Sequence, residues 1–271
     1  MPRRIALVLA LAVLAASPAA LAQLLFAVTE GVTYQATPKE IREKFEPLAE
    51  VIARTLKREV KIVLVPAYDD ARAGLGKQEF DFAFVHPAHV ALAEVKAGRY
   101  RTVAWTQGFT DYTVSLLVRP ESTMKAVTDL KGRTLVTPDP DSITAWMVRA
   151  MLRGEKLGEK DLRVRTTRYQ DAVPFYLEND FADVGATAAN AVVKTWTGKG
   201  GKVMVRSRSV PIKHVIASTK LSADDVDRIR EALLNLSNTD PGRKALSSTG
   251  YKGFQAPNSE VEVGAIAWLG L

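Results

Sequence analysis

The sequence predicts an α/β fold of two lobes, and three observations support this prediction. Beyond residue 22, short apolar runs alternate with amphipathic segments almost to the end of the chain, which is typical of α/β folds with largely parallel sheets. A polar, glycine-containing stretch at 107–112 divides these runs into two sets. The chain has 271 residues, enough for two modest domains. We therefore expect one set of strands and helices in each lobe.

The first lobe is predicted to begin with a strand at 24–29, followed by a helix. Thr37, Pro38 and Glu40 provide an N-cap, a proline at the first helical position and a capping-box glutamate. Apolar side chains at helical spacing predict the buried face of this helix: Ile41, Phe45, Leu48, Ile52 and Leu56. The other strands expected in this set are 60–65, 82–85 and 102–106, with a loop at 66–70.

The second lobe is predicted to begin with a strand at 113–118. A strand at 135–136 and a helix over 142–153 follow, and the remaining strands of this set are expected at 162–166, 182–186 and 203–205. A strand at 212–217 then returns to the first lobe, and Ser222 starts a helix that buries Val226, Ile229, Leu233 and Leu236. The predicted lobes are 23–111 plus 211–271, and 112–210, with a ligand cleft between them where strand ends and helix N-termini converge.

The first 22 residues predict a cleaved secretory signal peptide. Arg3 and Arg4 precede an apolar run at 5–16, and Ala20-Leu21-Ala22 forms an A-x-A cleavage site. The alternative is an uncleaved membrane anchor, but the apolar run is shorter than the roughly 20 residues that a spanning helix needs. We therefore expect a soluble mature chain in the periplasm.

The composition excludes several kinds of function. The chain has no cysteine, which removes disulfides, thiolate metal sites and cysteine nucleophiles. The formal net charge is +7, of which Arg3 and Arg4 contribute two. Such a balance keeps a protein soluble, and it also suits an anionic ligand. Dense basic blocks interleaved with aromatic residues are missing from the sequence, so nucleic acid is not an expected partner.

The segment 129–153 is the most informative candidate site. It is predicted to form a short strand, a turn rich in Pro and Asp, and a helix whose first turn carries Ser142 and Thr144. Free backbone N–H groups at a helix N-terminus, together with these two hydroxyls, can bind one small anion. The alternative is that Asp141 or Ser142 only caps the helix. Both interpretations stay open at this point.

Seven motifs give the chain a resemblance to a known family. In chain order they are residues 26–30 (Phe-Ala-Val-Thr-Glu), 65–68 (Val-Pro-Ala-Tyr), 80–84 (Phe-Asp-Phe-Ala-Phe), 129–133 (Asp-Leu-Lys-Gly-Arg), 139–144 (Asp-Pro-Asp-Ser-Ile-Thr), 182–186 (Ala-Asp-Val-Gly-Ala) and 211–214 (Pro-Ile-Lys-His). With these motifs the chain resembles the phosphate-, phosphite- and phosphonate-binding periplasmic proteins of ABC transporters. The resemblance implies a type II periplasmic binding protein fold, with two mixed, mainly parallel sheets, flanking helices and a two-segment hinge.

The resemblance also implies which residues contact an oxyanion: the loop tyrosine, here Tyr68, and the hydroxyls of Ser142 and Thr144. The family commonly has Asp-Pro-x-Ser-Thr-Ser-Gly at this turn. In this chain Ile143 replaces the middle hydroxyl and Ala145 replaces the glycine, so one expected donor is missing.

Two further candidate positions come from the same comparison. Tyr169 lies where some relatives have a histidine. Lys213 aligns with an acidic residue of relatives that bind aminophosphonates, and a lysine would repel an ammonium group. We therefore expect a ligand without an amine. His214 is next to Lys213 on a predicted strand, so only one of these two side chains can face the cleft.

Glu30 and His86 complete the set of candidate ligand-binding residues. Glu30 either meets the ligand or orients a neighbouring group. His86 ends a predicted strand and either donates a hydrogen bond to the ligand or is a satisfied histidine in the lobe wall. His89 lies three residues beyond His86, but a metal site needs more convergent ligands than this pair. We expect no metal and no other cofactor.

Reversible binding is the function that these features favour. We expect a monomer that captures a small oxyanion by lobe closure and delivers it to an ABC importer. The alternative is a sensing role, in which the closed form is presented to a sensor histidine kinase. An exported hydrolase is a third possibility, but the sequence contains neither Gly-x-Ser-x-Gly nor His-Glu-x-x-His, and its three histidines have no recognised catalytic spacing.

Overall fold

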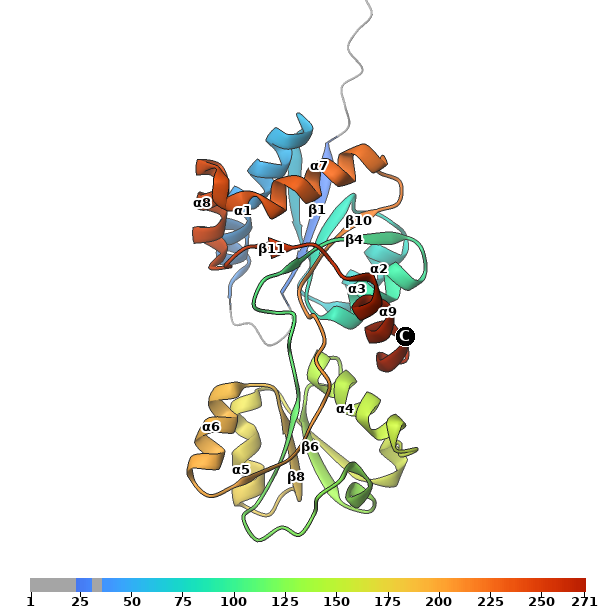
Figure 1. Ribbon diagram of the computed structural model, residues 1–271, viewed down its shortest axis with the longest axis vertical. Coiled ribbons are helices and arrows are strands. Elements are labelled where there is room, and N and C mark those ends of the chain that lie inside the picture. The colour runs from blue at the N-terminus through green and yellow to red at the C-terminus, as the bar shows by residue number, and fades with distance from the viewer. Residues whose placement is uncertain (1–22, 31–35) are drawn as a thin grey trace, which may run out of the picture.

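The computed structural model describes residues 23–30 and 36–271 and has two α/β lobes stacked along its long axis (Figure 1). The predicted signal peptide lies outside the described residues. Within the described ranges, none of the helices is both long enough and apolar enough to cross a bilayer.

The first lobe is built on a six-stranded sheet in the order β11-β4-β10-β3-β1-β2. Strand β1 pairs in parallel with β2 and β3, whereas β10 pairs antiparallel with β3 and β4. The strands are β1 (Leu24–Thr29), β2 (Val60–Leu64), β3 (Phe82–Val85), β4 (Tyr100–Thr106), β10 (His214–Ser218) and β11 (Phe254–Gln255).

Helices cover both faces of this sheet. One face carries α1 (Pro38–Leu56), α7 (Ala223–Leu234) and α8 (Asp240–Thr249), and the other carries α2 (Tyr68–Gly76) and α3 (Ala88–Lys96). The capping box predicted for α1 is confirmed: Glu40 N–H donates to Thr37 Oγ1 at 3.2 Å, and Thr37 N–H donates to Glu40 Oε2 at 2.7 Å. Helix α2 begins at Tyr68, so the loop after β2 covers only residues 65–67. The loop predicted for 66–70 is too long, because residues 68–70 form the first turn of the helix.

The second lobe is built on a five-stranded sheet in the order β7-β6-β8-β5-β9. Helix α4 (Ile143–Gly154) packs on one face, and α5 (Val173–Glu178) and α6 (Asn190–Gly198) pack on the other. The strands are β5 (Ser115–Val118), β6 (Thr134–Pro138), β7 (Arg163–Thr167), β8 (Val184–Thr187) and β9 (Lys202–Arg206). Short 3-10 helices lie at Val127–Leu130, Glu159–Asp161, Gln170–Ala172 (η3) and Leu236–Asn238.

Two crossing segments join the lobes, residues 107–114 on the way out and 207–213 on the way back. They pair with each other in antiparallel fashion. Val210 N–H donates to the Tyr112 carbonyl at 3.0 Å, and Ile212 N–H donates to the Phe109 carbonyl at 2.9 Å. The two crossing segments are therefore joined to each other as well as to both lobes.

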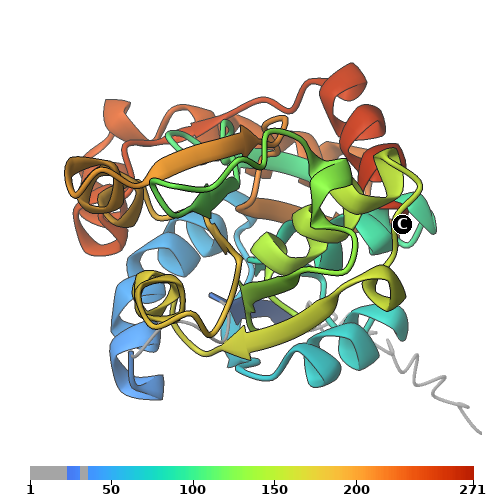
Figure 2. The ribbon, with the colours of Figure 1, turned by 90° about the horizontal axis from the view of Figure 1, so that it is seen from below.

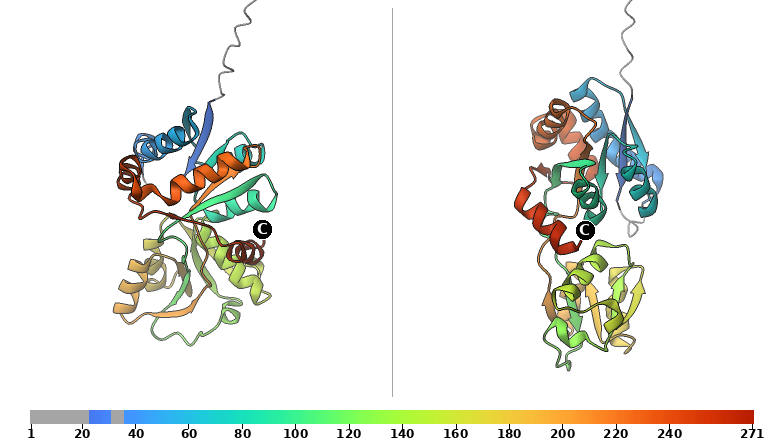
Figure 3. Two further views of the ribbon diagram at one scale, coloured as in Figure 1. Left: turned by 45° about the horizontal axis from the view of Figure 1, so that its top comes forward. Right: turned by 90° about the vertical axis from the view of Figure 1, so that its right-hand side faces the viewer.

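The C-terminal helix α9 (Ser259–Leu269) also connects the lobes. Its side chains Ala265 and Leu269 share one apolar cluster with Leu92 of α3 and Met151 of α4. Seen from below, α9 runs beside α4 (Figure 2), and the tilted view places it next to the junction of the two lobes (Figure 3). The lobes are therefore held together by packing on the α3–α4 side as well as by the crossing segments.

Gly185 in the centre of β8 tests how tightly the second lobe is packed. A Cβ atom at this position would lie 2.4 Å from Val173 Cγ1 and 3.2 Å from Leu177 Cδ1. We expect Gly185→Ala to lower the free energy of unfolding by about 2 kcal/mol, because overpacking a buried site forces neighbours out of their rotamers. Urea unfolding measures the change.

Gly154 in the last turn of α4 is the matched control, since a Cβ there would meet nothing within 4 Å. Gly154→Ala should leave stability unchanged or raise it slightly. Equal losses for both variants would show that Gly185 is not tightly enclosed.

Candidate functional site

A cavity of about 610 Å³ opens between the lobes at the carboxyl ends of β1 and β2. Its walls include Thr29 and Glu30 from the end of β1 and residues 65–67 from the loop before α2. Arg168, in the loop between β7 and η3, is the second-lobe residue in the wall. The cavity therefore lies across the cleft between the lobes.

The N-terminus of α4 uses some of its free donors in capping. Ser142 is the N-cap: Ala145 N–H donates to its Oγ at 3.2 Å, and Trp146 N–H donates to its carbonyl at 3.1 Å. The capping alternative for Ser142 is thus present in the structure. In the part of the chain that the structure describes, the N–H groups of Ile143 and Thr144 have no acceptor, so two helix N-terminal donors remain for an anion.

Thr144 starts a chain of side-chain hydrogen bonds inside the second lobe. Its Oγ1 lies 2.9 Å from the Tyr112 hydroxyl, to which Gln170 Nε2 donates at 3.4 Å. Gln170 Oε1 in turn accepts from Thr187 Oγ1 at 3.1 Å. Burial raises the pKa of Tyr112, and its hydrogen bonds to Thr144 and Gln170 oppose this shift. The chain of bonds fixes the Thr144 hydroxyl at the start of α4.

Tyr169, the neighbouring residue that the sequence comparison selected, lies outside this chain of bonds. It is half-buried, and the Arg168 guanidinium carbon lies 5.4 Å from its ring centroid. Gln170 is the residue that reaches the Thr144 site, and sequence reasoning missed it. Gln170 directly follows Tyr169, and its place in the short polar stretch after β7 was the sequence signal that could have identified it.

Tyr68 takes part in a contact that crosses between the lobes. Its buried ring meets the ring of His89 edge-on, with centroids 6.4 Å apart, and His89 stacks on Trp146 of α4 with centroids 4.5 Å apart. Beside this stack, Arg72 Nη2 donates to Asp141 Oδ1 at 2.9 Å. Asp141 is therefore paired with a cation from the first lobe. Burial lowers the pKa of His89 to about 3, so the stacked imidazole is neutral.

His86 lies directly after β3 and is almost fully buried. Its Nδ1 is 3.0 Å from the Ile212 carbonyl, which can only accept, so Nδ1 carries the proton. Burial lowers the pKa of His86 to about 4, although the Ile212 bond opposes the shift. A neutral imidazole has one ring N–H group, and His86 donates this group to the Ile212 carbonyl.

Lys213 and His214 point to opposite faces of the first sheet, as the alternation of a strand requires. His214 is fully buried with its ring edge-on to Trp105, and burial lowers its pKa to about 3. Among the described residues, neither of its ring nitrogens has a hydrogen-bond partner. Lys213 points toward Glu30, which lines the cavity.

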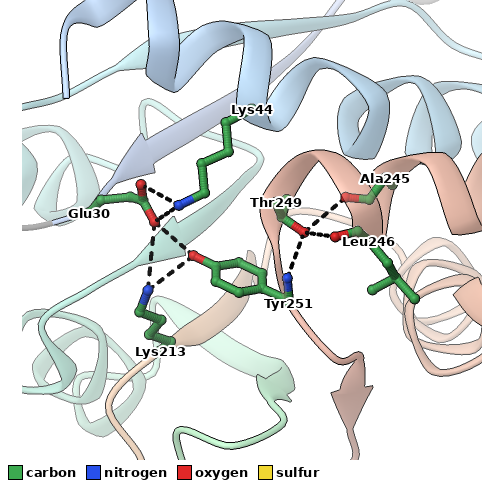
Figure 4. A network of polar contacts seen from close by, with 7 residues as sticks. All are labelled: Glu30, Lys44, Lys213, Ala245, Leu246, Thr249 and Tyr251. Carbon is green, nitrogen blue, oxygen red and sulfur yellow. Dashed lines mark hydrogen bonds and ion pairs between the residues drawn. The ribbon is translucent and has the colours of Figure 1, made fainter.

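Glu30 is the centre of a buried polar network (Figure 4). Lys44 Nζ donates to both carboxylate oxygens at 2.8 Å, and the Tyr251 hydroxyl donates to Oε1 at 2.7 Å. Lys213 Nζ lies 3.7 Å from Oε1, donates to the Tyr251 hydroxyl oxygen at 3.1 Å, and lies 4.3 Å from the centroid of the Phe109 ring. Glu30 thus orients neighbouring groups, which is one of the two roles that the sequence left open.

Two opposing effects set the pKa values in this network. Burial alone would raise the pKa of Glu30, but the hydrogen bonds from Lys44 and Tyr251 and the charge of Lys213 outweigh it, so the pKa is lowered. Burial lowers the pKa of Lys213 to about 8, and Glu30 offsets part of that shift. Both groups are therefore charged at neutral pH.

Arg168 is a cleft residue that sequence reasoning missed. It lines the cavity between the lobes and also a neighbouring cavity of about 310 Å³ beside Asp139 and Pro140. Its side chain forms no hydrogen bond or ion pair with any residue that the structure describes. No periodicity marks a single arginine in a loop, so the sequence carried no signal for it.

The described residues contain no group of three or more acidic or histidine side chains that could hold a metal ion.

Two α/β lobes joined by a paired crossing, with a cavity between them that residues of both lobes line, are typical of two-lobed ligand-binding proteins. The chain belongs to the family described as "ABC transporter, phosphonate, periplasmic substrate-binding protein", whose sequence model matches residues 31–261. Members of this family bind a solute for an importer in the periplasm, so this chain is a binding protein and not an enzyme. No curated protein matches the sequence.

Solved structures share the fold at low sequence identity. XAC2383 from Xanthomonas citri, bound to ATP, is 16% identical with a TM-score of 0.73, over 92% of this chain and 97% of that one. PhnD1 from Prochlorococcus marinus, in complex with methylphosphonate, is 13% identical with a TM-score of 0.65 over the same shares. The aliphatic sulphonate binding protein SsuA from Escherichia coli is 14% identical with a TM-score of 0.56, over 92% and 90%. The type II periplasmic binding protein fold is thus confirmed.

Glu30 supplies a test of the buried network. We expect Glu30→Gln to lower the free energy of unfolding by about 3 kcal/mol, because it leaves Lys44 and Lys213 without their common carboxylate. Glu43→Gln in α1 removes only an exposed ion pair with Lys39 and should cost less than about 1 kcal/mol. Urea unfolding at pH 7 compares the two. Similar small losses would show that the network is not required for stability.

Proposed function

We propose that this protein captures a small organic oxyanion of the phosphonate type, without an ammonium group, in the cleft between its lobes. The observation that carries the proposal is the positive charge of the cleft. Glu30 lies in the cavity wall, and Lys44 and Lys213 contact it from behind, so these three side chains together carry a formal charge of +1. Arg168 adds a second positive charge, which lies in the wall itself. The Ile143 and Thr144 N–H groups add donors of the kind that bind oxyanions.

Lys213 supports the exclusion of amines from the ligand. A cation buried at the carboxyl end of β1 repels a ligand ammonium group, and its own counter-charge, Glu30, already contacts Lys44 and Tyr251. Ser142, Thr144, Tyr68, His86 and Tyr169 remain proposed ligand-binding residues. Among them Thr144 has the strongest support, because its hydroxyl is fixed at the N-terminus of α4.

Capture is proposed to occur by rotation of the lobes about the paired crossing segments. The moving bodies would be 23–111 plus 211–271 and 112–210, which matches the division of the strands between the two sheets. We further propose that the protein acts as a monomer and that a signal peptide is cleaved after Ala22. Size-exclusion chromatography and N-terminal sequencing of the exported protein test these two points.

The closed form would be delivered to an ABC importer. A sensor histidine kinase would recognise the same closed form, so the partner distinguishes the two roles. Ligand-dependent stimulation of ATPase activity in vesicles that contain the importer would support delivery. Stimulation of kinase autophosphorylation without any effect on the importer would support the sensing role.

Discrimination against amines is the direct test of the proposed ligand class. We expect ethylphosphonate to bind at least tenfold more tightly than 2-aminoethylphosphonate in calorimetric titrations at pH 7, because Lys213 and Arg168 repel the ammonium group. Equal or tighter binding of 2-aminoethylphosphonate would overturn the exclusion of amines. If neither compound binds, the oxyanion proposal itself is wrong.

Thr144 tests the site at the start of α4. Thr144→Val keeps the shape of the side chain and removes the hydroxyl, so we expect the affinity for methylphosphonate to fall at least tenfold. Thr197→Val is the matched control: it removes a helical threonine hydroxyl that donates to the Val193 carbonyl on α6. Calorimetry provides the affinities, and melting temperatures of the unliganded variants verify folding. An unchanged affinity in Thr144→Val would place the oxyanion elsewhere.

A further inference from the structure

Arg168 is the second-lobe residue in the wall of the cavity between the lobes, and the proposed capture of an oxyanion does not by itself explain its surroundings. Arg168 comes from the second lobe, yet the other residues in the wall of its cavity come from the first lobe. Its side chain is exposed, and the part of the chain that the structure describes offers it no carboxylate or carbonyl partner. An arginine that spans a cleft without an acceptor is suited to a ligand that supplies one.

The other basic residues near the cleft are already occupied. Arg72 binds Asp69 and Asp141, and Arg149 binds Glu159 and the Pro140 carbonyl. Glu30 is the acidic residue of the cavity wall, and its oxygens accept from Lys44 and Tyr251. Arg168 is therefore positioned to bind a ligand rather than to close an ion pair within the protein.

Thr29 provides a second, independent sign of a ligand in this cavity. The residue lies in the cavity wall, its hydroxyl oxygen is buried, and within the described residues this oxygen has no hydrogen-bond partner. A buried polar atom without a partner costs free energy unless a ligand or a water molecule forms a hydrogen bond with it. Thr29 and Arg168 thus place a buried hydroxyl and an exposed guanidinium in the wall of one cavity, from opposite lobes.

The rest of the cavity wall is mainly apolar. Between the two polar groups lie Pro38 and Ile41 of α1 and the side chains of residues 64–67. An inorganic oxyanion gains nothing from such a surface, whereas an alkyl or aryl substituent gains free energy by leaving water. A cavity of about 610 Å³ is also much larger than a tetrahedral oxyanion requires.

We propose that Arg168 is a specificity-determining residue, which binds the anionic group of the ligand while the first-lobe wall binds an apolar organic substituent. Within the phosphonate class of the proposed function, the ligand then has an apolar alkyl or aryl substituent. This inference rests on the proposed function and adds to it the size and polarity of the substituent. Arg168 also binds only when both lobes approach the ligand, so it links anion binding to closure.

A series of alkylphosphonates from methyl to butyl tests the apolar wall. In the wild-type protein, we expect the affinity to rise about fourfold for each added methylene, which is the gain for burying one such group. Ile41→Ala should reduce this gain, because it removes part of the apolar wall. Calorimetric titration gives both values. A flat or falling series in the wild-type protein would overturn the assignment of the apolar wall.

Arg168→Gln tests the cation across the cleft. We expect a loss of at least tenfold in affinity for every member of the series, with no change in the gain per methylene. Arg165→Gln is the matched control, because it removes the same charge from an exposed arginine on β7 that does not line the cavity. Equal affinities for the two variants would overturn the role of Arg168. Circular dichroism and melting temperatures establish that each variant folds.

The outcomes separate this inference from the proposed function. If no alkylphosphonate of any length binds the wild-type protein, both the proposed function and this inference are wrong. If methylphosphonate binds but neither Arg168→Gln nor chain length changes the affinity, only this inference is wrong.

Discussion

The buried carboxylate of Glu30 is the constraint on which the cleft depends. A carboxylate removed from water is tolerated only when cations and donors surround it, so its partners must be brought to one point. These partners come from α1, from the strand entry at Lys213 and from Tyr251 after α8, which is 221 residues away in the sequence. The network fixes the ends of the first-lobe elements at the edge where the ligand cavity opens.

The same network decides the electrostatic character of the site. Because two ammonium groups share one carboxylate, the group of side chains behind the cavity wall keeps a positive charge while each lysine is paired. In the second lobe, the start of α4 has donors for the anion binding that we propose as well as for capping. Ser142 stabilises the helix, while the N–H groups of Ile143 and Thr144 have no acceptor among the residues that the structure describes. Capping and anion binding, which the sequence presents as alternatives, are compatible at one helix terminus because each uses different N–H groups.

The sequence predicted those parts of the structure that depend on local signals. The capping residues Thr37 and Ser222 start their helices as expected, because a cap is decided within four residues. The partners of Glu30 were beyond such reasoning, since long-range packing brings them together. Arg168 lies in the loop after β7 and Gln170 begins the short helix η3, and neither segment has a periodic pattern. The place of Arg168 in the cavity wall and that of Gln170 inside the second lobe follow only from how the elements pack. The α/β class and the fold were predictable, whereas the lining of the site was not.

The position of α9 has a consequence for the free energy difference between the arrangements that the two lobes can take. Ala265 and Leu269 bury apolar surface against helices of both lobes. In the lobe closure that we propose, any change of this contact shifts the populations of open and closed forms. Neither residue lines the ligand cavity. The apparent affinity of a protein that must close depends on the fraction of molecules in the competent form. Evolution can therefore adjust the working concentration range of this protein through its last helix, without altering any atom that recognises the ligand.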